Sequence, residues 1–345
     1  MKKQNIVNLI KYHVDKNEDA FISEVTEIAR DFDMKGDHSL AQYIMELIAS
    51  ADFYIPQNSY TNLRYLQKKE YSLKPLLLPN IIEEDIMGIT RAINNKAGLS
   101  KFLFYGEPGS GKTESAYQIA RLLNRDILSV NFEQLVDSRL GETGKNVALL
   151  FDEINHLSYN RVIIVFDEID SIVLDRVNKN DLREMGRVTS LFLKEMDRLN
   201  ENIIIIATTN LHKNLDKALM RRFDGVISFD RYSKEDLVDI ASSMLVDYLK
   251  RLHNSKQDMR LFHKILNKQT KLPYPGDLKQ IIRTAVAFSD ASSGYDYLRK
   301  IYLALSGNLE KVDIQTLNNE GFTTREIEIL SRISKSSVSR KLRRI

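Results

Sequence analysis

One feature constrains the fold of this 345-residue chain more than any other, a glycine-rich loop with the sequence Gly106-Glu107-Pro108-Gly109-Ser110-Gly111-Lys112-Thr113. It follows Phe102–Tyr105, an apolar run that predicts a strand, and precedes Glu114–Asn124, whose apolar residues recur at helical spacing. Strand, loop and helix in this order are the context of a P-loop, and a plain turn does not require Gly-Lys-Thr. Its glycines let the backbone N–H groups point at phosphate oxygens, and the helix N-terminus adds positive potential there. Lys112 can reach the β- and γ-phosphates, and the Thr113 hydroxyl can ligate Mg²⁺.

A second apolar run, Val162–Phe166, is followed by Asp167 and Glu168. Continuous apolar residues indicate a strand buried on both faces, and ligands meet a parallel sheet at the carboxyl ends of its strands. Asp167 would then hold Mg²⁺, and Glu168 would orient and deprotonate the attacking water. Many strands end in Asp-Glu, so the motif is informative because a P-loop lies roughly fifty residues upstream.

Two polar sites downstream suit the same chemistry. Ile203–Ala207 predicts another buried strand, and it is followed by two threonines and Asn210, which can hydrogen-bond the γ-phosphate or the attacking water. A strand-terminal turn is the alternative explanation for this Asn. Arg221 and Arg222 follow a short helical pattern, and guanidinium groups suit charge developing on a transferring phosphoryl group. A solvated basic helix end is the alternative, because the helix dipole favours it.

The patterning divides the chain into four segments. Residues 1–72, helical in pattern to about Lys69, predict a helical N-terminal docking or oligomerisation domain. Residues 73–230 alternate short β-rich runs with helical stretches, which predicts an α/β fold with a parallel sheet covered by helices on both faces. Residues 231–306 return to helical patterning, and residues 307–345 form a basic tail. The strand candidates are Phe102–Tyr105, Ile127–Val130, Val162–Phe166, Ile203–Ala207 and Val226–Phe229.

Composition excludes several functions. The chain has no Cys, which excludes disulfides, Cys-ligated zinc and a thiol nucleophile. Its formal net charge of +3 predicts neither a nucleic-acid binder nor an acidic-substrate enzyme for the chain as a whole. Charges at Lys11, Asp15 and Lys16 interrupt any signal-peptide core, and no apolar run reaches membrane-spanning length. We therefore expect a soluble cytoplasmic protein with no membrane partner.

Taken together, these motifs resemble those of the AAA+ ATPases over roughly residues 76–286. By this resemblance Gly106–Thr113 is Walker A, Val162–Glu168 is Walker B and Asn210 is sensor 1. Gly276 looks like part of the lid segment that packs near the nucleotide. The resemblance implies a P-loop αβα sheet with a helical lid, a site for ATP and Mg²⁺, and ATP hydrolysis.

Arg221 and Arg222 look like the arginine fingers that, in this family, reach the nucleotide of the neighbouring subunit. The resemblance therefore implies a homo-oligomer, usually a ring of six, in which a single subunit is a poor ATPase. The pattern Leu-Met-Arg-Arg-Phe-Asp is most similar to the AAA branch that severs or disassembles protein assemblies. Members that thread polypeptides carry a pore aromatic where this chain has Arg139, so threading stays open.

The segment from Asn5 to Phe229 also looks like a group of bacterial AAA ATPases. Members of that group are often encoded beside a subtilisin-like protease and are linked to plasmid incompatibility or phage defence. The lid has no Arg at the sensor 2 position of the family. Lys279 lies near that position, either as a phosphate contact or as a solvated helix residue.

The basic tail carries a separate motif. Thr323, with a Glu three residues later, predicts a capping box at the start of a helix. The run Ser-Lys-Ser-Ser-Val-Ser-Arg, ending at Arg340, resembles the second helix of DNA-binding helix-turn-helix segments. Ser336, Ser337 and Arg340 could then face base edges while basic side chains contact phosphates. A protein-docking or solvated helical hairpin is the alternative, because a Glu and an Arg replace the small residue and turn glycine of the motif.

Two functions compete on this sequence. In the first, Mg-ATP hydrolysis in an oligomeric ring remodels or regulates a protein partner, such as a protease or its substrate. In the second, ATP switches a DNA-binding regulator of the initiator or transposition-regulator type. The Arg-Arg-Phe-Asp pattern favours the first function and the tail motif favours the second. A scaffold that binds ATP without hydrolysing it is a third explanation, which an intact Glu168 opposes.

Overall fold

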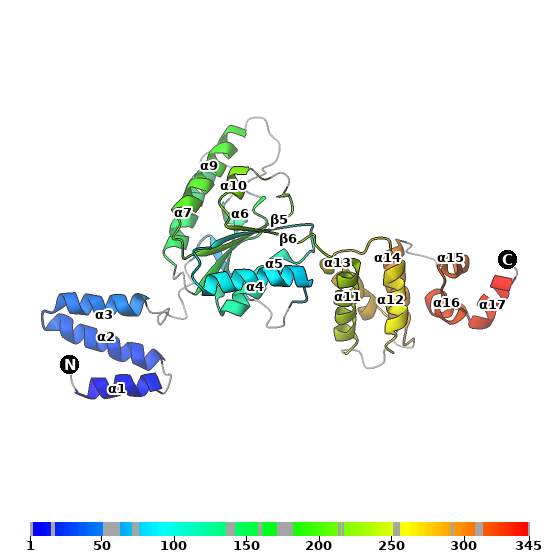
Figure 1. Ribbon diagram of the computed structural model, residues 1–345, viewed down its shortest axis with the longest axis horizontal. Coiled ribbons are helices and arrows are strands. Elements are labelled where there is room, and N and C mark those ends of the chain that lie inside the picture. The colour runs from blue at the N-terminus through cyan, green and yellow to red at the C-terminus, as the bar shows by residue number, and fades with distance from the viewer. Residues whose placement is uncertain are drawn as a thin grey trace.

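The computed structural model describes the chain apart from residues 1–2, 15–17, 51–62, 71–75, 136–141, 158–160, 171–181, 213–214, 216, 251–255, 291–292, 308–312 and 344–345. The described residues form, in chain order, three N-terminal helices, an α/β domain, a helical lid and a second group of helices (Figure 1). The prediction of an α/β fold with a parallel sheet is confirmed. A search of the described helices finds none that is long and apolar enough to span a membrane.

The N-terminal helices pack through small and branched side chains. Ile28, Ala29 and Ala41 are buried between them. Many apolar residues of this segment remain exposed, among them Ile10 and Val14, so these three helices hold only a small core. The helices are α1 (Lys3–Val14), α2 (Glu18–Met34) and α3 (His38–Ser50).

The first strand lies where the sequence predicts helix. Leu66–Lys69 forms β1, which pairs antiparallel with β3 (Asp126–Val130), so the prediction of helical structure to about Lys69 is wrong there. A four-residue segment has too few positions to show a period, and its conformation depends on a partner distant in sequence. The Glu153 carboxylate fixes the approach to β1 by accepting the backbone N–H groups of Arg64 and Tyr65 at 2.7 and 3.0 Å.

Among the described residues the sheet has six strands in the order β1-β3-β4-β5-β2-β6, and all neighbours except β1 and β3 are parallel. Every strand predicted from the sequence is confirmed, Val162–Phe166 with the same bounds and the others with ends that move by at most two residues. The strand that leads into the glycine-rich loop, β2, lies between β5 and β6, both of which follow it in the chain. The remaining bounds are β2 (Lys101–Tyr105), β4 (Val162–Phe166), β5 (Ile204–Thr209) and β6 (Gly225–Ser228).

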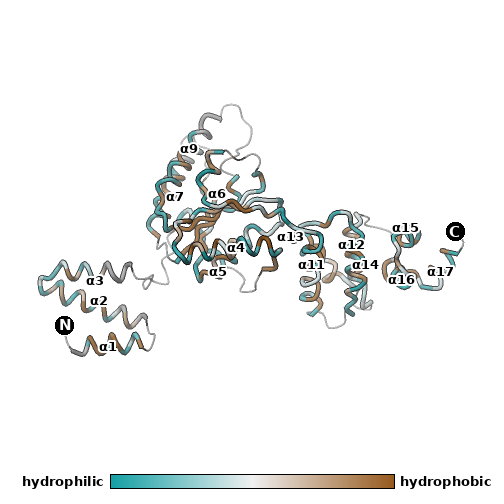
Figure 2. The backbone as a smooth tube through the Cα atoms, viewed as in Figure 1, coloured by the Kyte–Doolittle hydropathy of each residue, from teal (hydrophilic) through white to brown (hydrophobic). Residues whose placement is uncertain are grey.

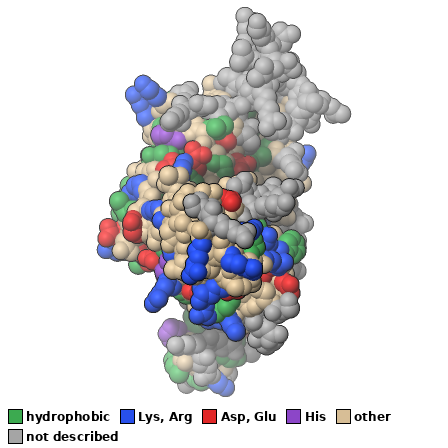
Figure 3. All heavy atoms as spheres, turned by 90° about the vertical axis from the view of Figure 1, so that its right-hand side faces the viewer, with side chains coloured by type: hydrophobic (Ala, Val, Ile, Leu, Met, Phe, Trp, Pro, Cys, Tyr) green, Lys and Arg blue, Asp and Glu red, His purple; other side chains and the backbone are tan. Residues whose placement is uncertain are grey.

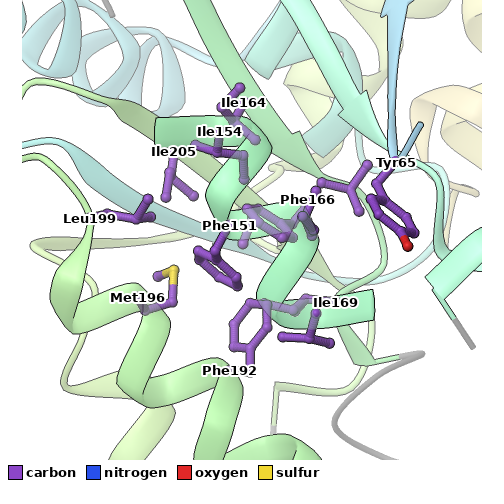
Figure 4. Packing of buried hydrophobic residues seen from close by; sticks show 14 of the residues in the cluster. Tyr65, Phe151, Ile154, Ile164, Phe166, Ile169, Phe192, Met196, Leu199 and Ile205 are labelled. Carbon is purple, nitrogen blue, oxygen red and sulfur yellow. The ribbon is translucent and has the colours of Figure 1, made fainter. Parts of the chain in front are cut away.

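The sheet is buried on both faces, which explains its uninterrupted apolar strands. Figure 2 shows hydrophobic residues running along the central strands. On one face, the ring of Phe192 meets those of Phe151 and Phe166 edge-on, with centroids 5.2 and 5.5 Å apart (Figure 4). This packing fixes the end of β4 immediately before Asp167. The helices of the domain are α4 (Asn80–Asn94), α5 (Lys112–Leu123), α6 (Phe132–Leu135), α7 (Glu142–Asn155), α9 (Leu182–Arg198) and α10 (Lys217–Met220).

The lid and the C-terminal helices share one hydrophobic cluster, although they lie on either side of the boundary predicted near residue 306. Leu317, Ile327 and Val338 are completely buried in this cluster. The lid helices are α11 (Lys234–Leu249), α12 (Met259–Lys268), α13 (Pro275–Ala287) and α14 (Asp296–Ser306). The C-terminal helices are α15 (Ile314–Asn319), α16 (Thr324–Ser331) and α17 (Lys335–Arg343).

Candidate nucleotide-binding site

The glycine-rich loop joins β2 to α5, as the sequence predicts. Three of its glycines have positive φ, with 151° at Gly106, 75° at Gly109 and 97° at Gly111, the residue that caps α5. A Cβ at Gly106 would lie 2.9 Å from an oxygen of Asp230, so this position also lacks room for a side chain. Glycine is therefore required here both by conformation and by space.

Lys112 is buried beneath this loop. Its Nζ donates hydrogen bonds to the carbonyl oxygens of Gly106 and Glu107 at 2.8 and 2.9 Å. Burial lowers the pKa of Lys112, and the negative charges of Asp230 and Asp167 oppose that shift. A phosphate group in the loop would be a stronger acceptor for this cation than two neutral carbonyls.

Asp167 lies at the carboxyl end of β4 and links two hydroxyl groups. Its Oδ1 accepts hydrogen bonds from Thr113 at 2.7 Å and from Thr208 of β5 at 2.6 Å. A hydroxyl and a carboxylate oxygen this close form a hard-oxygen donor pair, which suits Mg²⁺ completed by phosphate oxygens and water. The sequence analysis does not identify Thr208, because a Thr at the end of a buried strand carries no signal of its own.

Glu168 adopts an uncommon backbone conformation, with φ of 56°. Its backbone N–H donates to the Thr208 hydroxyl at 2.9 Å, and its side chain accepts a 3.4 Å hydrogen bond from Asn210. Left-handed backbone at a residue with a side chain costs free energy and is concentrated at functional sites. The structure therefore brings the two predicted polar residues together beside the P-loop.

The lid contacts the P-loop through backbone atoms. The N–H of Gly276, in the first turn of α13, donates to the carbonyl of Gly109 at 2.8 Å. Residues 229–233, which join β6 to α11 and which we call the hinge, hold the loop from the other side. Asp230 accepts the N–H of Glu107 at 2.7 Å, and Tyr232 donates its hydroxyl to the carbonyl of Ser110 at 2.6 Å.

Tyr232 stays a proton donor in this arrangement, because burial raises the pKa of its hydroxyl. Tyr274 packs edge-on against Tyr232 and donates to Asp230 at 3.3 Å. Asp230, Tyr232 and Tyr274 are not predicted from the sequence as site residues. Their only signal is their place in the polar punctuation between a strand and a helix, which most loops share.

These elements enclose a cavity of about 550 Å³. Its polar end is formed by the P-loop and the ends of β4 and β5, and its apolar end suits the flat face of a nucleobase. Lys279 lies in the lining from the lid side. The lining residues that the sequence analysis identifies are Pro108, Gly109, Gly111, Lys112, Thr113, Asp167, Glu168, Asn210, Gly276 and Lys279, and those it misses include Leu76, Leu77, Leu78, Tyr117, Gln118, Thr208, Tyr232 and Met244.

Arg221, Arg222 and the predicted DNA-contacting residues of the tail do not line this cavity. Arg222 is held within its own chain, since its guanidinium donates to Asp197 of α9 at 3.2 and 3.0 Å. Arg221 is exposed, and its side chain makes no hydrogen bond or ion pair with the part of the chain that the structure describes. Arg139 lies outside the described residues. Ser336, Ser337 and Arg340 lie together on α17, away from the nucleotide cavity.

The Gly276→Ala variant tests the contact between the lid and Gly109 of the P-loop. The new Cβ would lie 2.8 Å from Cα and 3.1 Å from the carbonyl oxygen of Gly109. Overpacking of this kind costs about 1–3 kcal/mol, so we expect nucleotide affinity to fall by roughly 5- to 150-fold in a fluorescent-nucleotide titration. Gly88→Ala is the control, because its Cβ meets no atom within 4 Å, and it should leave affinity unchanged. Equal affinities for the two variants would show that the lid does not close on the nucleotide through this contact.

A buried parallel sheet, a P-loop at the carboxyl end of β2 and carboxylates at the end of β4 define the class of P-loop nucleoside triphosphatases. Within that class, residues 102–231 match the family described as ATPase family associated with various cellular activities, AAA. This stretch of the chain therefore matches an AAA family ATPase domain.

Known proteins are similar to parts of this chain that differ in extent. The chain is 36% identical over 132 residues to the uncharacterized AAA family ATPase y4kL of Sinorhizobium fredii, covering 38% of this chain and 39% of that protein. It is 31% identical over 191 residues to cell division protein C of Sulfolobus acidocaldarius, covering 53% and 48%. The chain thus spans less than half the length of these relatives. The crystal structure of the FIGL-1 AAA domain in complex with ADP matches its fold with a TM-score of 0.52 at 18% identity, covering 74% of this chain and 90% of that chain.

Proposed function

We propose that this protein binds and hydrolyses Mg-ATP and uses the energy, as a homo-oligomer, to remodel or regulate a protein partner. One observation carries the proposal: Lys112, Thr113, Asp167, Glu168 and Asn210 line or border a single cavity large enough for a nucleotide. These are the groups that phosphoryl transfer to water needs, namely a cation, hard oxygen ligands and a base.

Each residue has a distinct role in the proposed reaction. The P-loop N–H groups and Lys112 bind the phosphates and neutralise their charge. Thr113 and Asp167 would hold Mg²⁺, which supplies charge neutralisation and orientation of the β- and γ-phosphates when bound. Glu168 accepts a proton from the attacking water, and Asn210 positions that carboxylate through the hydrogen bond between their side chains.

Exposure of Arg221 supports the oligomeric part of the proposal. An arginine that supplies charge to a neighbouring subunit has to be free of partners within its own chain, and among the described residues Arg221 meets this condition while Arg222 does not. Arg222 instead links α10 to α9, because its guanidinium donates to the carbonyl of Ala218 in α10 and to Asp197 in α9. We therefore assign the intersubunit role to Arg221, and a ring of six is the arrangement that the AAA resemblance favours.

The dependence of ATPase activity on protein concentration tests this assignment. If the site is completed by a neighbour, specific activity rises with concentration, and ATP increases the sedimentation coefficient of the hydrolysis-deficient Glu168→Gln variant. The matched measurement without nucleotide provides the control. Constant specific activity in a protein that sediments as a monomer with and without ATP would contradict the oligomeric proposal.

A second candidate function is an ATP-switched DNA-binding regulator. The specific observation in its favour is that α16 and α17 form a pair of short helices, joined at Arg332, in the region where the sequence resembles a DNA-binding motif. The Thr323–Glu326 capping box is present at the start of α16. Both candidates require the ATP site, and they differ in the macromolecule on which it acts.

A further inference from the structure

The C-terminal helices place their apolar residues against the lid. Val338 is buried in α17, and Ile333 and Leu342 pack against the same cluster. The rest of α17 is polar, with no acidic residue between Lys335 and Arg343. The helix therefore has one face buried in the hydrophobic cluster that the C-terminal helices share with the lid, and an opposite face that is hydrophilic and basic.

The acidic side chains of these helices are engaged by the protein itself. Glu326 forms an ion pair with Lys264 of α12 at 2.6 Å, and Glu320 accepts the Tyr302 hydroxyl at 2.9 Å. Glu328 accepts the N–H of Lys335 at the start of α17 at 2.9 Å. Glu326 is neutralised by its ion pair, and Glu320 and Glu328 keep their charge but are held by a hydroxyl and a backbone N–H rather than by a basic side chain of α17.

The hydrophilic side of α17 carries basic side chains whose positive charge is not paired in the part of the chain that the structure describes. We call this surface the α17 cationic face and define it as Ser336, Arg340, Lys341 and Arg343. All four are exposed, and the three basic side chains make no ion pair within the described residues. Figure 3 shows Lys and Arg side chains gathered on the side of the molecule that carries the C-terminal helices. Arg332 does not belong to this face, because it is paired with Asp296 of the lid at 2.7 Å.

We propose that the α17 cationic face binds duplex DNA, with the helix in the major groove, and that the lid makes this binding depend on nucleotide. A single α-helix fits the major groove of B-DNA, whereas the major groove of A-form RNA is too narrow for side chains to read. A membrane surface is disfavoured, since an interfacial helix needs exposed apolar residues and those of α17 pack in the shared hydrophobic cluster. This inference rests on the second proposed function and extends it to specific residues and to its regulation.

The dependence on nucleotide follows from how the C-terminal helices are attached. Asp296 is almost completely buried, with 1% of its side chain exposed, and it pairs with Arg332 at the turn between α16 and α17. Together with the shared cluster and the Lys264–Glu326 ion pair, this joins the lid to α16, and α17 packs on α16. Because Gly276 attaches the same lid to the P-loop, a rotation of the lid on nucleotide binding also moves the cationic face.

The full-length Arg340→Ser/Lys341→Ser variant tests the surface. Binding to a fluorescent duplex of roughly 20 base pairs, about two helical turns, is measured by anisotropy between about 50 and 200 mM salt. We expect wild type to bind with a salt-dependent affinity. The variant should bind about tenfold more weakly, with the slope of log affinity against log salt reduced by about 1.8. Arg91→Ser/Lys96→Ser removes the same charge from α4 and the turn that follows it in the α/β domain, and it should bind as wild type.

The lid connection is tested by the same titration with and without ATP. In Glu168→Gln the affinity for DNA should change on adding ATP, and in Lys112→Ala, which we expect not to bind nucleotide, it should not. Absence of DNA binding in wild type, or equal binding by the α17 variant and wild type, would contradict the proposal that the α17 cationic face binds DNA. Equal affinity for DNA with and without ATP in Glu168→Gln would contradict the proposal that the lid makes DNA binding depend on nucleotide. Neither titration requires hydrolysis, so a wild type that binds DNA but releases no phosphate would count only against the proposed ATPase.

Circular dichroism melting separates loss of a contact from loss of fold. The substituted side chains are exposed, so the melting temperature of the α17 variant should equal that of wild type. Truncation after residue 306 is a poorer test, because it would expose the lid surface that Leu317, Phe322 and Ile327 cover.

Discussion

Glu168→Gln is expected to lower ATP turnover by a factor of about 10² to 10⁴ while nucleotide affinity stays near that of wild type. The amide has almost the same shape as the carboxylate and can still pair with Asn210, but it cannot accept a proton from water. The backbone N–H of residue 168 would still donate to Thr208, so the local fold should be retained. Steady-state phosphate release and a fluorescent-nucleotide titration measure the two quantities separately.

Glu201→Gln is the control for this substitution, because it makes the same chemical change at an exposed turn before β5. It should leave both turnover and affinity unchanged. Turnover near the wild-type level in Glu168→Gln would show that another group activates the water. The non-hydrolysing scaffold predicts a third pattern, in which wild type itself binds ATP and releases no phosphate.

Arg221→Ala is expected to reduce turnover by about a thousandfold, the lower end of the range for an arginine that stabilises charge in phosphoryl transfer. Arg222→Ala should act differently, by removing a partly exposed ion pair with Asp197 that contributes about 0–1 kcal/mol to stability. Phosphate release and thermal melting of both variants distinguish the two roles.

Mixing two inactive variants gives the sharper test of Arg221. An Arg221→Ala subunit retains Glu168, and a Glu168→Gln subunit retains Arg221. If the arginine acts on the neighbouring subunit, the mixture contains sites with both residues and regains activity. A mixture that stays as inactive as either variant alone would place Arg221 outside the neighbour's site.

Much of the candidate site could be predicted because its chemistry depends on short segments. The glycine-rich loop specifies its own backbone, and Val162–Phe166 has the bounds in the structure that its apolar run gives it. Parallel strands present their carboxyl ends at one edge, so Asp167 and Asn210 were expected near each other without knowledge of the strand order.

The remaining features depend on contacts between distant residues. Thr208 has a defined role only when β5 lies beside β4, and Asp230 only when the hinge lies against Gly106. The difference between Arg221 and Arg222 depends on Asp197, which no local pattern connects to them. Nor does sequence periodicity indicate that the tail shares a core with the lid, because both segments are simply helical.

The position of β2 in the sheet has a consequence for how the protein folds. In the register of the sheet Lys101 of β2 pairs with Ile205 of β5, a separation of 104 residues (205 − 101), and β6 closes the other side. Pairing across so long a chain segment is slow, since loop-closure entropy is lost before the contacts form. The nucleotide site is therefore assembled late, and a nascent chain that ends before β5 has the P-loop sequence without the paired strand that shapes it.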